Sequence, residues 1–64
     1  MEDWQKRVVE ERDQLKEKID KLEKFLDAPK SLDAYSIATL TEQKKHMVNY
    51  YVVLNARIGM FTQL

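Results

Sequence analysis

The sequence contains no cysteine and has only one glycine, one proline and one histidine. Without cysteine the chain cannot form disulfides, cysteine zinc sites, iron–sulfur centres or a cysteine nucleophile. One histidine is too few for a multi-histidine metal centre within a single chain. These absences exclude the commonest small metal-binding and disulfide-bonded domains, and they fit a reducing, intracellular environment.

An excess of charge of one sign is also absent, since 11 Lys and Arg residues balance 11 Asp and Glu residues. Non-specific binding to a nucleic-acid polymer depends on a basic surface, so the balanced charge disfavours that function. No run of residues approaches the roughly 18 apolar residues of a membrane-spanning helix. Acidic residues stand near the N-terminus, where a signal peptide needs basic ones. We therefore expect a soluble protein that binds neither nucleic-acid polymers nor membranes.

The scarcity of glycine and proline predicts a mostly helical chain with one break, near Pro29. The proline ring disfavours the helical conformation at Ala28, so a first helix is predicted over about 2–27 and a turn over 28–33. Apolar residues in the first segment recur at steps of three, four or seven, which is the period of a helix. These residues are Trp4, Val8, Leu15, Ile19, Leu22, Phe25 and Leu26.

A second helix is predicted over about 34–63, because apolar residues there keep a seven-residue step. The series is Leu40, Met47, Leu54 and Phe61. Asp33 is a candidate N-cap for this helix, since its carboxylate can accept a hydrogen bond from the backbone N–H of Tyr35 or Ser36. Thr39 and Glu42 form a competing capping box.

Residues 1–64 are thus expected to form a single all-α domain, an antiparallel two-helix hairpin about 40 Å long. A lone hairpin has no closed core, and a chain of this size buries little of its surface. The second helix carries apolar residues on more than one face, so it needs to pack on something besides the first helix. We expect the hairpin to assemble into a compact helical homo-oligomer.

The heptad pattern of each predicted helix mixes apolar and polar residues. In the first helix the a series is Val8, Leu15 and Leu22, and the d series is Trp4, Glu11, Lys18 and Phe25. In the second helix the a series is Leu40, Met47, Leu54 and Phe61, and the d series is Gln43, Tyr50 and Arg57. We expect both series to lie at helix contacts.

Two interpretations of the polar seam residues are open. In the first interpretation, these residues form interface salt bridges that set the register, for example between Glu11 and Arg57. Alternatively, basic residues converge where protomers meet and form a cationic pocket for an anionic ligand. The basic residues concerned are Arg7, Lys18, Lys21 and Arg57. Trp4, Tyr50 and Tyr51 favour the second interpretation because aromatic rings stack on nucleobases, although packing is their more frequent role.

The sequence gives little support to catalysis. Glu10 and Glu11 are adjacent on a helix and diverge, while Asp20 and Glu23 lie in a pattern of salt bridges. No glycine-rich loop is present to hold a phosphate. We expect a protein that is not an enzyme and has no cofactor.

His46 is the one residue that suggests a metal, through Glu42 one helical turn before it. Such a pair would need symmetry-related copies to complete a coordination shell. The simpler interpretation is a surface histidine, so no metal is expected.

Taken together, the helical register resembles that of the small phage anti-CBASS sponge proteins and their uncharacterised phage relatives. The resemblance spans nearly the whole chain. In the first helix it rests on Arg7, Val8, Glu11, Leu15, Lys18, Lys21, Leu22, Phe25 and Leu26. In the second helix it rests on Leu40, Gln43, Met47, Tyr50, Leu54, Arg57 and Ile58.

The resemblance implies a helical homohexamer that binds cyclic dinucleotides, or related cyclic nucleotide or cyclic ADP-ribose signals, at protomer interfaces. Sequestering these messengers without cleavage would block CBASS or Thoeris-like antiviral signalling in the cytoplasm of the infected bacterial host. The implied ligand-binding residues are Trp4, Gln5, Lys18 or Lys21, and Arg57. The alternative is a non-enzymatic adaptor of phage origin, whose apolar second helix docks on a protein partner.

Overall fold

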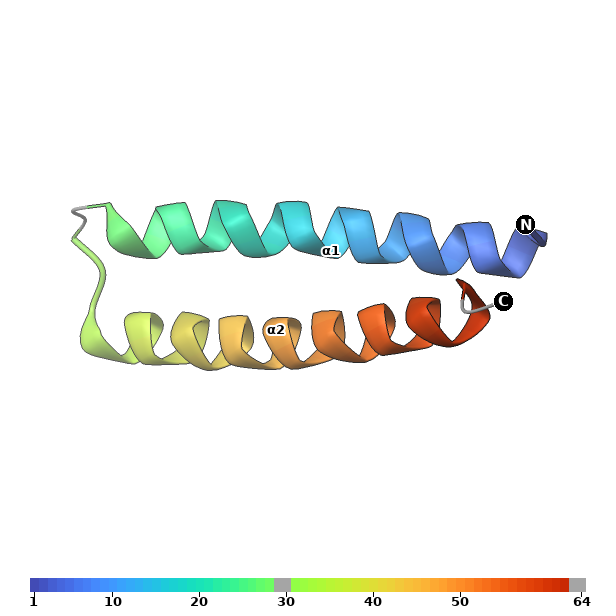
Figure 1. Ribbon diagram of the computed structural model, residues 1–64. Helices are drawn as coiled ribbons and strands as arrows, with labels where there is room; N and C mark the ends of the chain where they lie inside the picture. Colours follow the sequence, from blue (N-terminus) through green and yellow to red (C-terminus); the bar gives the residue numbers. More distant parts are fainter. Residues whose placement is uncertain (29–30, 63–64) are drawn as a thin grey trace.

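The computed structural model describes residues 1–28 and 31–62, which form two α-helices, α1 (Asp3–Asp27) and α2 (Ala34–Thr62). The helices lie side by side and run in opposite directions, so the start of α1 and the end of α2 meet at one end of the molecule (Figure 1). The molecule is 49 Å long and 14 Å wide. The prediction of an all-helical hairpin is confirmed. Part of the expected turn over 28–33 and the expected end of the second helix at residue 63 lie outside the described residues.

Side-chain caps explain where both helices begin. Before α1, the backbone N–H of Glu2 donates to Oε1 of Gln5 at 2.7 Å. Before α2, the backbone N–H of Ser36 donates to Oδ1 of Asp33 at 3.2 Å, which confirms Asp33 as the N-cap. The competing box at Thr39 and Glu42 lies inside the helix, which has already begun at Ala34.

The contact between the helices follows one narrow stripe on each of them. The less exposed positions of α1 include Gln5, Val8, Arg12, Leu15, Ile19, Leu22 and Leu26, at alternating steps of three and four. Those of α2 include Leu40, Lys44, Met47, Tyr51, Leu54, Ile58 and Phe61. Only Val8, Ile19 and Leu54 are buried among the described residues, and Leu54 has no exposed surface. The core is therefore a single seam.

The predicted a positions lie on this seam, but the predicted d positions lie beside it and not on it. Two of them still reach the other helix, since Trp4 contacts Phe61 and Glu11 accepts a hydrogen bond from Tyr50. Trp4, Glu11, Lys18 and Phe25 are all exposed on α1, as are Gln43, Tyr50 and Arg57 on α2.

In each helix the seam residues that alternate with the a positions lie one residue after the predicted d positions. For example, Ile19 lies on the seam and Lys18 does not. This rotation places Ile19, Leu26 and Ile58 on the seam in place of Lys18, Phe25 and Arg57, and burial of aliphatic side chains favours it. It also brings Arg12 and Lys44 to the seam, where they have polar partners in Asn55 and Glu23.

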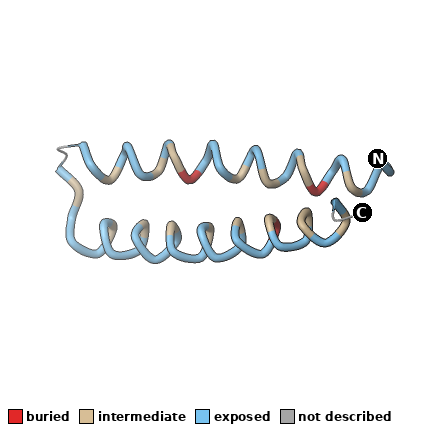
Figure 2. The backbone as a smooth tube through the Cα atoms, in the orientation of Figure 1, coloured by how far each residue is buried: buried red, intermediate tan, exposed pale blue. Residues whose placement is uncertain are grey.

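Most of the surface of the hairpin remains open (Figure 2). The accessible surface is 5,089 Å², against about 4,000 Å² for a compact monomer of this mass. Val52, Val53 and Met60 on α2 keep 59%, 52% and 78% of their surface exposed. This open apolar surface is consistent with the expected homo-oligomer, which stays a prediction. No helix in residues 1–28 or 31–62 is both long enough and apolar enough to cross a membrane.

Candidate functional site

A pocket of about 310 Å³ lies at the end of the hairpin where α1 begins and α2 ends. It is lined by Trp4 from α1 and by Arg57, Met60 and Phe61 from α2. The rings of Trp4 and Phe61 meet edge to face, with centroids 5.3 Å apart and planes at 80°. The antiparallel pairing therefore brings together two predicted site residues, Trp4 and Arg57, that are far apart in the sequence.

Arg57 supplies the positive charge of this pocket. Its side chain is exposed, and it forms no ion pair with any residue in the described part of the chain. Arg57 lines the pocket together with the apolar side chains of Trp4, Met60 and Phe61. A guanidinium fork next to an indole ring offers a phosphate partner and a stacking surface at the same place.

The salt bridge proposed between Glu11 and Arg57 is wrong for the single protomer. Glu11 instead accepts a hydrogen bond from the hydroxyl of Tyr50, at 2.6 Å to Oε1 and 3.0 Å to Oε2. This hydrogen bond raises the pKa of Tyr50, with smaller contributions from desolvation and from the negative charge of Glu11. The nearby charge of Arg57 acts in the opposite direction. Within the protomer, Glu11 is thus paired with Tyr50 and not with Arg57.

Gln5 and Arg7 lie close to the pocket without lining it. Gln5 is half-buried and its side-chain oxygen is used in the cap with Glu2. Arg7 lies on the neighbouring surface of α1, in a shallow hollow of about 400 Å³ whose other lining residues are Asp3, Lys6 and Glu10. Two acids and two bases balance there, so this hollow alone does not favour an anion.

Lys18 and Lys21 are far from the Trp4–Arg57 pocket within one protomer. Lys18 follows Trp4 by 14 residues, so the two lie about 21 Å apart along the straight helix. Lys21 forms an exposed ion pair with Glu17 at 3.1 Å. Lys18 is exposed and has no ion pair within residues 1–28 and 31–62. One cyclic dinucleotide cannot touch either lysine and the pocket of the same chain.

Met60 and Phe61 are pocket residues that the sequence prediction did not include in the site. Phe61 was assigned to the seam, and Met60 to the general apolar surface of the second helix. Their spacing could have indicated that they belong to the site, because residues three and four places after Arg57 lie beside it on a helix.

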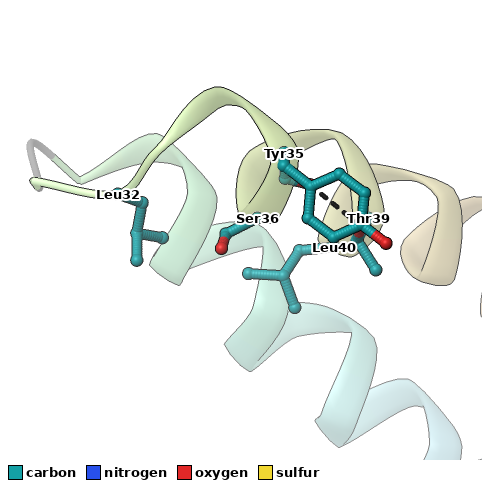
Figure 3. Close-up of a pocket in the computed structure, with 5 residues that line it drawn as sticks. All are labelled: Leu32, Tyr35, Ser36, Thr39 and Leu40. Atoms are coloured by element: carbon teal, nitrogen blue, oxygen red, sulfur yellow. Dashed lines mark hydrogen bonds between the residues drawn. The ribbon is translucent and has the colours of Figure 1, made fainter.

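A second apolar hollow lies next to the start of α2 (Figure 3). Its volume is about 320 Å³, and its lining residues are Leu32, Tyr35, Ser36, Thr39 and Leu40. The hydroxyl of Thr39 donates to the carbonyl oxygen of Tyr35 at 2.9 Å, and the Tyr35 side chain is 80% exposed. The lining includes no charged side chain, so it has no cation to pair with a phosphate.

The described residues contain no group of three or more histidines, cysteines and carboxylates that could hold a metal ion. His46 lies on the surface of α2, where its Nε2 atom is 3.1 Å from a carboxylate oxygen of Glu42. This contact is an exposed pair one helical turn apart. Its geometry is that of a surface ion pair when the imidazole is protonated.

Comparison with known proteins identifies the family of the chain. No curated protein and no solved structure matches it. The family model described as Sequestin matches residues 2–60, which include both helices up to Met60. This match confirms the resemblance to the cyclic-nucleotide sponge proteins of phages, and the family name indicates a protein that sequesters its target rather than an enzyme. The chain belongs to the Sequestin family.

Proposed function

We propose that this protein captures cyclic-oligonucleotide second messengers, or cyclic ADP-ribose signals, and holds them without cleavage. The observation that carries the proposal is the pairing of an unpartnered guanidinium with an exposed indole ring in one pocket, at Arg57 and Trp4. In the cytoplasm of an infected bacterium, such capture would remove the messenger of CBASS or Thoeris-like antiviral signalling. The effectors that depend on the messenger would then stay inactive.

The chemistry of the pocket suits one half of a cyclic dinucleotide. Arg57 can make two parallel hydrogen bonds to a phosphate, and Trp4 can cover the face of a base. A cyclic dinucleotide carries two phosphates, so a single arginine neutralises only half of its charge. The remaining cations of the predicted site are Arg7, Lys18 and Lys21, and they complete the site from neighbouring protomers of a homo-oligomer. The family resemblance suggests a hexamer.

Capture of this kind acts by stoichiometry. A sequestering protein lowers the free concentration of a messenger by binding it tightly, so no group is needed to attack or protonate the ligand. The protein must instead be abundant relative to the messenger.

Thermal unfolding in the presence of cyclic nucleotides tests the proposal. A ligand present at 100 times its dissociation constant stabilises the folded protein by about 2.7 kcal/mol per site, so a true ligand raises the melting temperature. The matched control is the linear dinucleotide of the same bases, which lacks the closed ring. Failure of every cyclic dinucleotide, cyclic trinucleotide and cyclic ADP-ribose to raise the melting temperature would refute the proposal.

A protein-interaction adaptor is the second candidate function. The observation in its favour is the exposed apolar surface of α2 at Val52, Val53 and Met60. An adaptor would show no thermal shift with any nucleotide. Changing Val52 and Val53 to serine would abolish binding of the protein partner. Neither residue lines the Trp4–Arg57 pocket.

A further inference from the structure

The rings of Trp4 and Phe61 join the two helices at the end of the hairpin where α1 begins and α2 ends. Their centroids are 5.3 Å apart and their planes are inclined at 80°, which is the edge-to-face geometry that aromatic pairs favour. The position of the Trp4 ring is therefore linked to that of Phe61.

The two rings differ in how firmly the helices hold them. Phe61 is half-buried and follows Leu54 by seven residues, so it continues the seam of α2 beyond the described residue with no exposed surface. Trp4 is the second residue of α1, and the ends of helices fray when little packs on them. Its side chain is 49% exposed. Phe61 is thus the better anchored ring of the pair.

The orientation of the Trp4 ring matters because a base stacks on it only where a ring face is open. In an edge-to-face pair each ring covers at most one face of the other, so the indole keeps a face that Phe61 does not touch. Arg57 lines the same pocket, one helical turn before Phe61 on α2. A ring that is held before the ligand arrives loses little side-chain freedom on binding, and such a loss would otherwise weaken affinity.

We propose that Phe61 is a positioning residue, which holds the Trp4 indole ready to stack on a base of a ligand whose phosphate is bound by Arg57. This inference rests on the proposed function and adds a residue that acts through Trp4. Phe61 lies one residue beyond the segment matched by the family model, which ends at Met60. If Phe61 only closed the end of the seam, an aliphatic side chain would serve equally well in its place.

Indole fluorescence tests the positioning role without any ligand, because Trp4 is the only tryptophan in the chain. The test variant is Phe61→Leu, which keeps an apolar side chain on the seam and removes the ring. Phe61→Tyr retains a ring and is the rescue variant. The matched control, Tyr35→Leu, removes an exposed ring at the opposite end of the hairpin. We expect the fluorescence anisotropy of Phe61→Leu to decay with a larger fast component than in the wild type, Phe61→Tyr or Tyr35→Leu.

Calorimetric titration measures the effect on capture, with the cyclic dinucleotides of guanine and of adenine as probes. Phe61→Leu should weaken binding about 2- to 12-fold, which corresponds to immobilising one freely moving side chain on binding. Phe61→Tyr and Tyr35→Leu should bind like the wild type. Urea unfolding of each variant gives the fraction of folded protein, so that the affinities refer to the folded state alone.

The positioning role is overturned if Phe61→Leu leaves the anisotropy decay of Trp4 unchanged, or if it frees the ring and still binds as tightly as the wild type. Failure of Phe61→Tyr to retain wild-type affinity would also overturn it. A residue that only closes the seam would lower stability in Phe61→Leu, with the decay and the affinity of the folded protein unchanged. These outcomes leave capture by the wild type intact. Absence of wild-type binding to both dinucleotides would instead contradict the capture of cyclic dinucleotides and this role of Phe61 together.

Discussion

The hydroxyl of Tyr50 on α2 donates to both carboxylate oxygens of Glu11 on α1, at 2.6 and 3.0 Å. This bond joins the two helices and gives the Glu11 carboxylate a partner within the protomer. Arg57 lines the Trp4 pocket and forms no ion pair within the described residues.

The first prediction concerns the titration of Tyr50. Its pKa is raised in the folded protein because the protonated hydroxyl donates to Glu11. The bond therefore contributes stability below pH of about 10, where tyrosine is protonated in the unfolded chain. That contribution is lost as the pH rises through the folded-state pKa. Nuclear magnetic resonance of the tyrosine rings should show the pKa of Tyr50 falling in Glu11→Gln, and an unchanged pKa would contradict the assignment of its cause.

The second prediction concerns Arg57. Arg57→Ala should weaken nucleotide binding by about 1.5–3 kcal/mol, or about 10- to 150-fold, because it removes a hydrogen bond to a charged phosphate. Calorimetric titration measures the loss, with Lys45→Ala as a control cation on the same helix. A double-mutant cycle for the free energy of unfolding should show no coupling between Arg57 and Glu11. Strong coupling, with unchanged affinity, would return Arg57 to a purely structural role.

The third prediction concerns the seam. Leu54 is the one described residue with no exposed surface, so Leu54→Ala should lower the free energy of unfolding by about 2–5 kcal/mol. The matched control is Val52→Ala, which alters an apolar side chain that is 59% exposed and should change stability by less than about 0.5 kcal/mol. Urea unfolding followed by circular dichroism measures both. Similar losses for the two variants would show that the seam is misplaced.

Sequence pattern predicted the local features of this fold better than the rotation of the helices. Asp33 was identified as an N-cap because capping depends on a few adjacent residues. The a positions, such as Leu54, were also correct. The d positions lie beside the seam and not on it, because a helix with one apolar series can turn either of two flanking stripes toward its partner. Only the packing of α1 on α2 decides between Lys18 and Ile19.

The candidate site could be predicted only in part for a related reason. Trp4 and Arg57 have the right chemistry in the sequence, and the antiparallel pairing of the ends of the chain brings them together. The same geometry holds Lys18 and Lys21 away from them, since both lie further along a straight helix. The residue pattern of one chain does not show which of its residues contact another chain.

The fourth prediction concerns Gly59, a glycine inside α2 at a position where the protomer has space for a larger side chain. A Cβ atom at this position would meet nothing within 4 Å. Alanine favours a helix over glycine, so Gly59→Ala should raise the free energy of unfolding by about 0.5–1 kcal/mol. Ala56→Gly, at an exposed position of the same helix, should lower it by a similar amount. A loss of stability in Gly59→Ala would mean that another chain or a ligand approaches the backbone here.

Equilibrium dialysis with a cyclic dinucleotide tests the central claim most directly, because it measures capture and the fate of the ligand in one experiment. The protein is placed on one side of the membrane, the ligand is allowed to equilibrate, and the bound fraction is recovered by heat denaturation and weighed by mass spectrometry. We predict that the ligand accumulates on the protein side in proportion to the protein, returns chemically unchanged, and accumulates much less with Arg57→Ala. Equal concentrations on both sides for every cyclic nucleotide tested, or recovery of a hydrolysed ligand, would contradict the account.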